Sequence, residues 1–443
     1  MTGGSDELAS LLTLAVECHR SGRVDEAVAL YTNVLRRAPH HAGAQHNLGV
    51  IAAVRNDHTA AVARFDAALA AVPDYLPALL HRGHSRRALG QWAAAAADYT
   101  QVVRLEPAHY DAQRALAFLW LALSHRGRSL DHFARTAELR RGEDRLGLAR
   151  RSLTQATRDK LRHDAAQFRY LAALGRNKPF FEDMARRYET VAADFPERAT
   201  ELSAAQRELL GDDYNTAIYR VDAPEIAAGA VTAPPNPMAI AALLADATPD
   251  IVVWDDLLTP AALRLLRDYL LRSTIWHDFS HINGFVAAYL EDGLACPLML
   301  QIADEVRRAL PAILAEKPLT QAWAFKGLRR SAAIAAHADD GVVSVNFWVT
   351  PDSANRHPEG GGLAICLTPP PVTTLRDYGA DAPVAAQFMA AHARTVRLIP
   401  YRANRAVVFP SRLIHGSQPT DLVDGYGNHR INITLLYGDR TAT

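Results

Sequence analysis

The pattern of apolar and polar positions divides the chain into a helical part and a part rich in short strands. Up to about residue 210, apolar residues recur at spacings of three and four, which is typical of helices that bury one face. At Ile251 the pattern changes to a short β-type run, followed by a predicted helix to about residue 271 with Thr259 as its N-cap. A second amphipathic helix is predicted at about 297–314.

Beyond Thr320 the chain reads as strands separated by Gly, Pro and Asp turns. The predicted strands are 321–326, 331–337, 342–349, 361–367, 395–399, 405–409 and 430–437. Many short strands with turn signals favour a double-stranded β-helix, the jelly-roll barrel. We therefore expect a multidomain α + β protein with a C-terminal barrel at 246–443.

A 34-residue period runs through the N-terminal third. It links Pro39, Pro73 and Pro107; Tyr31, Phe65, Tyr99 and Phe133; Ala27, Ala61 and Ala95; and Ala15, Gly49 and Gly83. A repeated helix-turn-helix unit of this length is the tetratricopeptide signature. The small residue lets two helices approach, the aromatic residue fills the gap between them, and the proline ends the unit.

The units predicted from this period are 8–41, 42–75, 76–109 and a degenerate fourth, 110–143. The resemblance to tetratricopeptide repeats implies an α-solenoid over residues 1–143 whose concave surface binds a protein or peptide. A dimer interface or a plain scaffold remains an alternative. Residues 144–245 are predicted as a helical connector and linker, with a loop at 233–237.

Composition excludes several classes of function. Lys+Arg and Asp+Glu are 48 each, so the net charge of zero requires neither nucleic acid nor an anionic membrane as partner. The three cysteines form no disulfide or zinc-site pattern. The N-terminus lacks the features of a signal peptide, and the longest apolar run, 115–123, is too short to span a bilayer. We therefore expect a cytoplasmic protein, and the sequence indicates no oligomeric state.

Four residues near the C-terminus carry candidate chemistry. His337 and Asp339 stand two apart on a predicted strand and so point to one face. With His415 from another strand they form a two-histidine, one-carboxylate set that can bind ferrous iron and leave one side open. Fifteen positions further (430 − 415), Arg430 opens the next strand, where its guanidinium could hold a dicarboxylate.

The set resembles the non-haem Fe(II)/2-oxoglutarate oxygenases, in particular bacterial ones linked to tetratricopeptide repeats. The resemblance covers roughly residues 250–440 and includes the segments 343–351, 359–363, 401–409 and 430–438. It implies that His337, Asp339 and His415 are Fe(II) ligands and that Arg430 anchors the distal carboxylate of 2-oxoglutarate, with O₂ as second co-substrate.

One position departs from that family. Many relatives have Ser two residues after the arginine, whereas this chain has Asn432, which can also donate to a carboxylate. We also expect Asn346 to face the site. The segment 369–394, between the two histidines, is either a lid over the substrate or a surface decoration.

Three functions remain open from the sequence. The first is a dioxygenase that hydroxylates a protein or peptide side chain held by the repeats, with desaturation or demethylation as other outcomes. The second is a hydroxylase of a small biosynthetic molecule. The third is a non-catalytic repeat adaptor whose barrel is vestigial or senses oxygen or 2-oxoglutarate.

Overall fold

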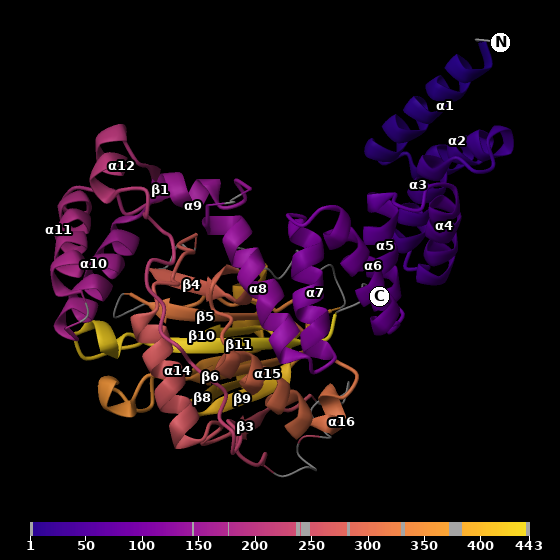
Figure 1. Cartoon of the computed structure of the whole chain (residues 1–443). Helices are drawn as coiled ribbons and strands as arrows, with labels where there is room; N and C mark the ends of the chain where they lie inside the picture. The colour runs from indigo at the N-terminus through magenta and orange to yellow at the C-terminus, as the bar shows by residue number, and fades with distance from the viewer. Residues whose placement is uncertain are drawn as a thin grey trace. The chain divides into compact units, whose positions relative to one another are not determined.

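The structure is a computed structural model that describes two compact units (Figure 1). The described residues are 3–143, 146–175, 177–235, 240, 249–280, 284–328, 333–371 and 383–439. Unit 1 is Met1–Leu123 and unit 2 is Ser124–Thr443.

Unit 1 consists of helices arranged as successive helix-turn-helix pairs. They are α1 (Gly3–Arg20), α2 (Val24–Arg37), α3 (Ala42–Val54), α4 (His58–Ala71), α5 (Leu76–Ala88), α6 (Trp92–Leu105) and α7 (Tyr110–Ala122). Phe65 and Tyr99 are fully buried. A Cβ on Gly49 would lie 2.6 Å from the Phe65 ring, and one on Gly83 would lie 2.5 Å from the Tyr99 ring. The predicted role of the small and aromatic positions is thus confirmed for these repeats.

The last predicted repeat helix, α8 (Arg126–Arg141), belongs to unit 2 rather than unit 1. Its Arg141 makes a bidentate ion pair with Asp292, and both side chains are buried. At its other end, Arg126 pairs with the buried Asp304 at 2.7 Å. These buried ion pairs join α8 to unit 2, although the predicted repeat region continues through α8 to residue 143.

The predicted connector is helical and has its own core. It contains α9 (Arg150–Thr154), α10 (Arg158–Ala173), α11 (Lys178–Ala193) and α12 (Ala204–Leu210), with a short pair of strands, β1 (Gln155–Ala156) and β2 (Thr200–Glu201). Apolar side chains of α10 and α11, such as Phe168 and Tyr188, form one buried cluster.

The segment after α12 lies along the rest of unit 2. The backbone N–H groups of Ala230 and Val231 both donate to the carboxylate of Glu305. Of the predicted loop 233–237, residues 236 and 237 lie outside the described part of the chain.

Two antiparallel sheets form the C-terminal part of unit 2. The larger has the order β3 (Val252–Trp254), β9 (Ala406–Pro410), β6 (Val343–Trp348), β11 (Ile431–Tyr437), β5 (Leu319–Gly327), β4 (Phe285–Tyr289); the smaller has the order β10 (His415–Ser417), β7 (Leu363–Cys366), β8 (Val396–Ile399). The described strands do not form a closed barrel.

Six of the seven strands predicted beyond Thr320 are confirmed, with bounds shifted by up to two residues. The predicted strand 331–337 is not a regular strand in its described part, 333–337. It contributes a single bridge, from His337 to His415. Strands β4 and β10 were not predicted.

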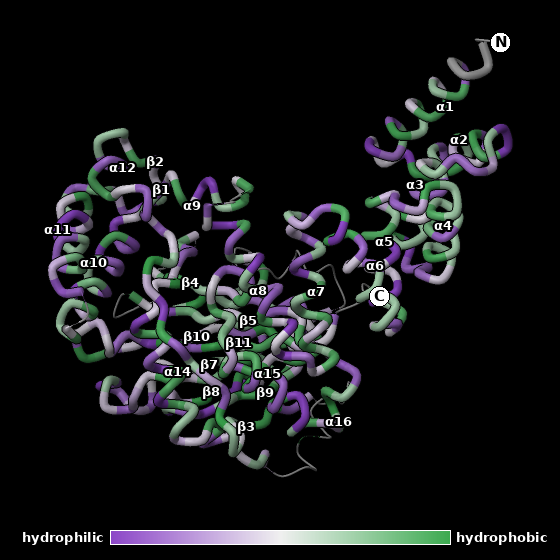
Figure 2. Tube along the Cα trace, in the orientation of Figure 1, coloured by the Kyte–Doolittle hydropathy of each residue, from purple (hydrophilic) through white to green (hydrophobic). Residues whose placement is uncertain are grey.

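A shared core joins the sheets. Trp348 and Phe409 of the larger sheet belong to one buried cluster with Leu363 and Ile365 of the smaller sheet. In Figure 2 the hydrophobic colour is concentrated in the strands, whereas the helices alternate along their length. Because β11 is buried at every position, its polar side chains must face something other than solvent.

Helices frame the sheets. Helix α14 (Pro260–Arg272) begins as predicted, with Thr259 accepting a hydrogen bond from Ala262 N–H and Pro260 at the first position. The predicted helix 297–314 is divided into α15 (Pro297–Ala309) and α16 (Pro311–Leu314), since Pro311 cannot continue α15.

Of the segment 369–394, residues 372–382 are outside the described chain, and α17 (Pro383–Ala391) packs near Ala336 and Ala338. None of the described helices is long and apolar enough to cross a membrane.

Candidate functional site

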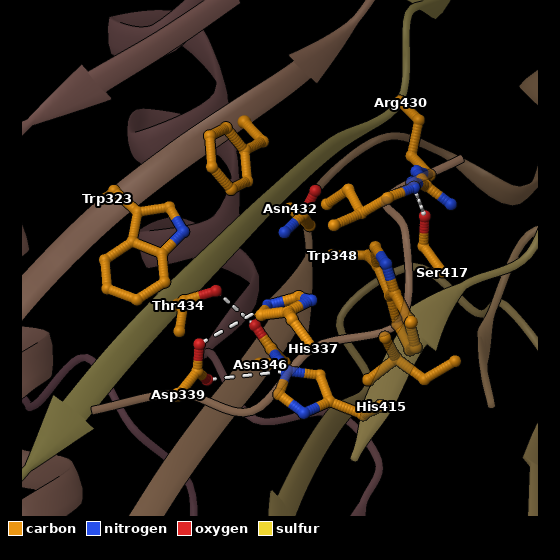
Figure 3. Close-up of a pocket in the computed structure, with 14 residues that line it drawn as sticks. Trp323, His337, Asp339, Asn346, Trp348, His415, Ser417, Arg430, Asn432 and Thr434 are labelled. Carbon is orange, nitrogen blue, oxygen red and sulfur yellow. Dashed lines mark hydrogen bonds and ion pairs between the residues drawn. The ribbon is translucent and has the colours of Figure 1, made fainter. Parts of the chain in front are cut away.

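A pocket between the two sheets gathers all the residues singled out for chemistry (Figure 3). The space in it that a water-sized group can occupy is about 30 Å³. The lining residues are Trp323, Phe325, Ile334, His337, Asp339, Asn346, Trp348, Leu363, His415, Gly416, Ser417, Arg430, Asn432 and Thr434. Every predicted site residue is therefore at this pocket.

His337, Asp339 and His415 converge at one end of the pocket. One ligand atom from each lies within 4.8 Å of the others. The Nε2 atoms of His337 and His415 are each 3.5 Å from an oxygen of Asp339, one on each side of the carboxylate. Asp339 and His415 are 6% and 3% exposed. Two imidazoles and a carboxylate this close, on two different chain segments, form a suitable site for a divalent metal.

Backbone carbonyls orient both imidazole rings. The Nδ1 atom of His337 lies 2.8 Å from Ala335 O, and that of His415 lies 2.9 Å from Leu413 O. A carbonyl can only accept, so both Nδ1 atoms carry a proton, and in the neutral form of each ring the Nε2 atom is left with a lone pair. In metal-binding histidines, the ring nitrogen that does not bind the metal usually donates a hydrogen bond in this way, which fixes the orientation of the ring.

The carboxylate is supported in the same way. Ser344 Oγ lies 2.8 Å from Asp339 Oδ2 and 2.9 Å from Ser411 Oγ. Burial raises the pKa of Asp339, but the charge of His415 and the hydrogen bond from His337 outweigh it and lower the pKa to about 2. Burial likewise lowers the pKa of His415 to about 4. At neutral pH the site therefore presents a carboxylate and a neutral His415, the forms that bind metal.

Arg430 lies at the other end of the pocket and is 1% exposed. Its Nη1 donates to Gly361 O at 2.8 Å and to Gln418 O at 3.2 Å, and its Nη2 donates to Ser417 Oγ at 2.9 Å. Among the described residues no carboxylate pairs with it, and its buried Nε–H has no acceptor.

Three of the five guanidinium N–H groups are thus used, and Nε–H and one Nη2–H remain. Burial lowers the pKa of Arg430 to about 10, so it stays charged at neutral pH. A buried cation with two unused donors is suited to binding one carboxylate bidentately.

The register of the strands determines which side chains line the pocket between the histidine–aspartate set and Arg430. Thr434 of β11 is flanked by Trp323 of β5 and Asn346 of β6, and Thr434 Oγ1 donates to Asn346 Oδ1. One row along, Asn432 is flanked by Phe325 and Trp348. The predicted inward orientation of Asn346 and Asn432 agrees with this register, and Asn432 Oδ1 is buried with no partner among the described residues.

Three pocket-associated residues were missed from the sequence. Ser344 supports Asp339, Ser417 contacts Arg430, and Trp323 lines the wall with an unpartnered Nε1. Ser344 and Trp323 alternate with core residues on predicted strands. This alternation could have indicated that both side chains face the pocket. Ser417 lies on the unpredicted β10, two residues after His415.

Comparison with known proteins identifies the N-terminal region. The tetratricopeptide repeat family model matches residues 19–75 and 80–137. The N-terminal region therefore contains tetratricopeptide repeats, as the 34-residue period predicted. These matched residues end before the first residue of the pocket. No curated protein matches the chain.

Several solved structures resemble part of the chain. The first tetratricopeptide domain of Spaghetti (RPAP3), bound to an HSP90 peptide, is 26% identical, with 27% of this chain and 95% of that chain covered and a TM-score of 0.26. A crystal structure of MamA is 14% identical, with 43% and 92% covered and a TM-score of 0.30. A MamA AMB-1 structure is 23% identical, with 32% and 77% covered and a TM-score of 0.29.

Proposed function

We propose that this protein is an Fe(II)- and 2-oxoglutarate-dependent dioxygenase. The observation that carries the proposal is Arg430, a fully buried guanidinium with two unused N–H groups in the same pocket as His337, Asp339 and His415. A buried charge without a counter-ion is expensive, and a bound dicarboxylate would supply the missing partner. A purely structural arginine at this place would be expected to have a carboxylate of the chain beside it.

The donor set also fits ferrous iron. Two imidazoles whose Nδ1–H groups are held by carbonyls form a facial triad with one carboxylate, and this triad leaves positions for other ligands. Each ring binds metal through Nε2 in its neutral form. When bound, Fe(II) would supply the oxidation chemistry, in which O₂ and 2-oxoglutarate are consumed, succinate and CO₂ are released and a substrate C–H is oxidised. Hydroxylation is the outcome we propose.

The chain's own residues would bind, orient and exclude water. Arg430 would hold the distal carboxylate of 2-oxoglutarate, and Asn432, one step along the same strand face, would donate its amide N–H to it. That role requires the Asn432 amide to be turned so that Nδ2 takes the position that the unpartnered Oδ1 occupies. The wall of Phe325 and Trp348 on either side would exclude water.

Strand order supports a jelly-roll arrangement for this unit. From β5 onward, successive segments alternate between the larger sheet and the smaller one: β5, the bridge at His337, β6, then β7 and β8, β9, β10 and β11. This order supports our proposal of a double-sheet jelly roll of eight segments, in which the segment at His337 would be reduced to one bridge.

A spectroscopic titration tests the proposal. Purified full-length protein is mixed anaerobically with Fe(II) and 2-oxoglutarate, and the visible charge-transfer band of the chelate is recorded. We expect a band in the wild type, no band in His337→Ala, and a requirement for far more 2-oxoglutarate in Arg430→Met. His357→Ala, at an exposed loop position, is the matched control and should behave as wild type. A folded wild type without a band would contradict the proposal.

A second candidate function is a protein-interaction adaptor, and the repeat match favours it. Tetratricopeptide repeats stack into solenoids whose concave surfaces bind extended partners. If both hold, the repeats bring a protein or peptide substrate to the oxygenase unit. A folded protein that binds metal yet never consumes 2-oxoglutarate with any candidate would leave the adaptor alone, whereas turnover of a free small molecule would favour a biosynthetic hydroxylase.

A further inference from the structure

The pocket has two chemically different ends. Arg430 is its one cation among the described lining residues other than the histidines, and it lies with Ser417 on one side of the triad in Figure 3. Trp323 lies on the other side, beyond Thr434, with the nitrogen-bearing edge of its ring turned toward Thr434 and Asn432. Among the described lining residues, no charged side chain other than the triad and Arg430 is present.

The indole N–H of Trp323 is a buried donor without an acceptor. Its Nε1 has no hydrogen-bond partner among the described residues. The residue paired with Trp323 across the strands is Thr434, and its hydroxyl already donates a hydrogen bond to Asn346. Trp254, by contrast, is buried and donates its Nε1–H to Thr232 Oγ1 at 3.3 Å. A buried N–H group that makes no hydrogen bond costs free energy. Because the Trp323 N–H lies at the pocket, we look for its acceptor in a bound ligand.

The aromatic wall narrows the class of that ligand. Phe325 lies 6.2 Å from Trp323, and Phe285 lies 6.2 Å from Phe325, measured between ring centroids. Among the described lining residues the one cation apart from the histidines is Arg430, which the co-substrate would occupy. A donor set in aromatic surface then favours a neutral acceptor over a carboxylate, since a carboxylate would lose its hydration without gaining a counter-ion.

We propose that Trp323 positions the substrate to be oxidised by donating its indole N–H to a neutral amide carbonyl, as in a peptide. This inference rests on the proposed function, because it assigns the Arg430 end to 2-oxoglutarate and leaves the Trp323 end for the substrate. The reacting carbon would then be close to an amide in the substrate. Trp323 contacts substrate but takes no part in proton or electron transfer.

The indole resonances of the full-length protein test this directly. The sample is ¹⁵N-labelled, loaded with Zn(II) in place of Fe(II) to keep it diamagnetic, and saturated with 2-oxoglutarate. The Trp323 signal is identified by its loss in Trp323→Phe, which keeps an aromatic ring and removes the donor. N-methylacetamide is the amide probe, and isobutylene, similar in shape but unable to accept, is the matched control.

We expect a saturable downfield shift of the Trp323 N–H proton with N-methylacetamide and none with isobutylene. The Trp254 signal, whose N–H is already paired and does not line the pocket, serves as the internal reference and should stay in place. An equal response to both probes, or no response to the amide, would overturn the proposal. A full downfield shift on adding 2-oxoglutarate alone would also overturn it, because the donor would then belong to the co-substrate.

A second measurement separates this inference from the proposed function. In the Fe(II) complex under anaerobic conditions, N-methylacetamide should perturb the charge-transfer band, and Trp323→Phe should raise its half-saturating concentration about 3- to 10-fold, the value of one neutral hydrogen bond. The 2-oxoglutarate requirement should not change. A normal band whose response to the amide is the same in wild type and Trp323→Phe would sink the role of Trp323 alone, whereas loss of the band in wild type would sink the dioxygenase.

Discussion

His337 and His415 are joined through their backbones as well as through their side chains. Each N–H donates to the other's carbonyl, at 2.9 and 2.8 Å, and the two ring centroids are 4.5 Å apart. Each Nδ1 is also close to the carbonyl two residues before it. The two histidines are therefore fixed relative to one another before any metal is bound, which reduces the ordering that metal binding must cause.

The first prediction concerns the support of the carboxylate. Ser344→Ala removes the hydroxyl that donates to Asp339 and keeps the strand, so Fe(II) affinity should fall about 10- to 100-fold, as is usual for such outer partners. The measurement is an anaerobic Fe(II) titration at saturating 2-oxoglutarate. Ser411→Ala, which removes only the next hydroxyl in the chain of bonds, is the control and should have the smaller effect. Equal affinities for wild type and Ser344→Ala would contradict the metal assignment of Asp339.

The second prediction is that Arg430 contributes more to ligand binding than to stability. Arg430→Met keeps an unbranched side chain. It removes a buried charge that has no counter-ion but also the hydrogen bonds to Gly361 and Ser417, so the two effects oppose each other and the free energy of unfolding without ligand should change by less than about 2 kcal/mol. Binding of 2-oxoglutarate should weaken roughly 100-fold, since two charge-assisted hydrogen bonds are lost. Thermal denaturation with and without 2-oxoglutarate checks both values.

The control for this variant is Arg397→Met. Arg397 is half exposed and pairs with Asp250 away from the pocket, so both its stability and its response to 2-oxoglutarate should match wild type. In wild type, 2-oxoglutarate with Fe(II) should raise the melting temperature, because a ligand that binds only the folded state stabilises it. A ligand-induced rise of the same size in Arg430→Met would remove Arg430 from the binding site.

Much of the site was predictable because alternation on strands is a local rule. His337 and Asp339 share a face whether or not their segment forms a regular strand, and Asn432 follows Arg430 by two positions on β11. The repeat period was equally visible, since Gly49 and Gly83 must recur wherever Phe65 and Tyr99 pack against a neighbouring helix. Strand alternation acts between residues that are close in the sequence, and the repeat period recurs at a fixed spacing, so both can be read from the sequence.

What could not be predicted depends on contacts between distant segments. Ser417 contacts Arg430 only because β10 pairs with β7, and no local pattern marks β10 as a strand. The assignment of α8 to unit 2 depends on Arg141 and Asp292, which are 151 residues apart. Period and composition gave α8 to the repeats, whereas the buried ion pair determines where it packs.

The third prediction follows from that pair and concerns the boundary of the C-terminal unit. A protein beginning at residue 246, the predicted boundary, lacks Arg141 together with all of α8 and the connector helices, so Asp292, which is 2% exposed in the full chain, loses both its main partner and its cover. The apolar side chains that pack against these helices also become exposed to water, which removes a large part of a domain's stability. We expect this fragment to be unfolded by circular dichroism and to form no band with Fe(II) and 2-oxoglutarate.

A fragment beginning at residue 124 is the matched comparison, since it retains α8 and the partners of Asp292 and Asp304. We expect it to fold and to give the wild-type band. Asp292→Asn in the full chain isolates the ion pair from the loss of the helices, and it should lower the free energy of unfolding by about 3–5 kcal/mol. A stable, band-forming fragment from residue 246 would show that the connector is dispensable.

The last prediction concerns the acid stability of the repeats. His46 of α3 is 9% exposed, and burial, together with the nearby His81, lowers its pKa to about 4; burial with Arg87 and His81 does the same for His84 of α5. A lowered pKa means that the unfolded chain binds the proton more readily, with a pKa near 6.5. The contribution is therefore complete above about pH 6.5 and is lost as the pH falls toward 4, by about 3 kcal/mol for His46. His46→Gln, which cannot be protonated, should show a smaller fall in the melting temperature of the full chain between pH 6.5 and 4, measured by circular dichroism. An equal fall in both proteins would mean that other groups dominate the acid response.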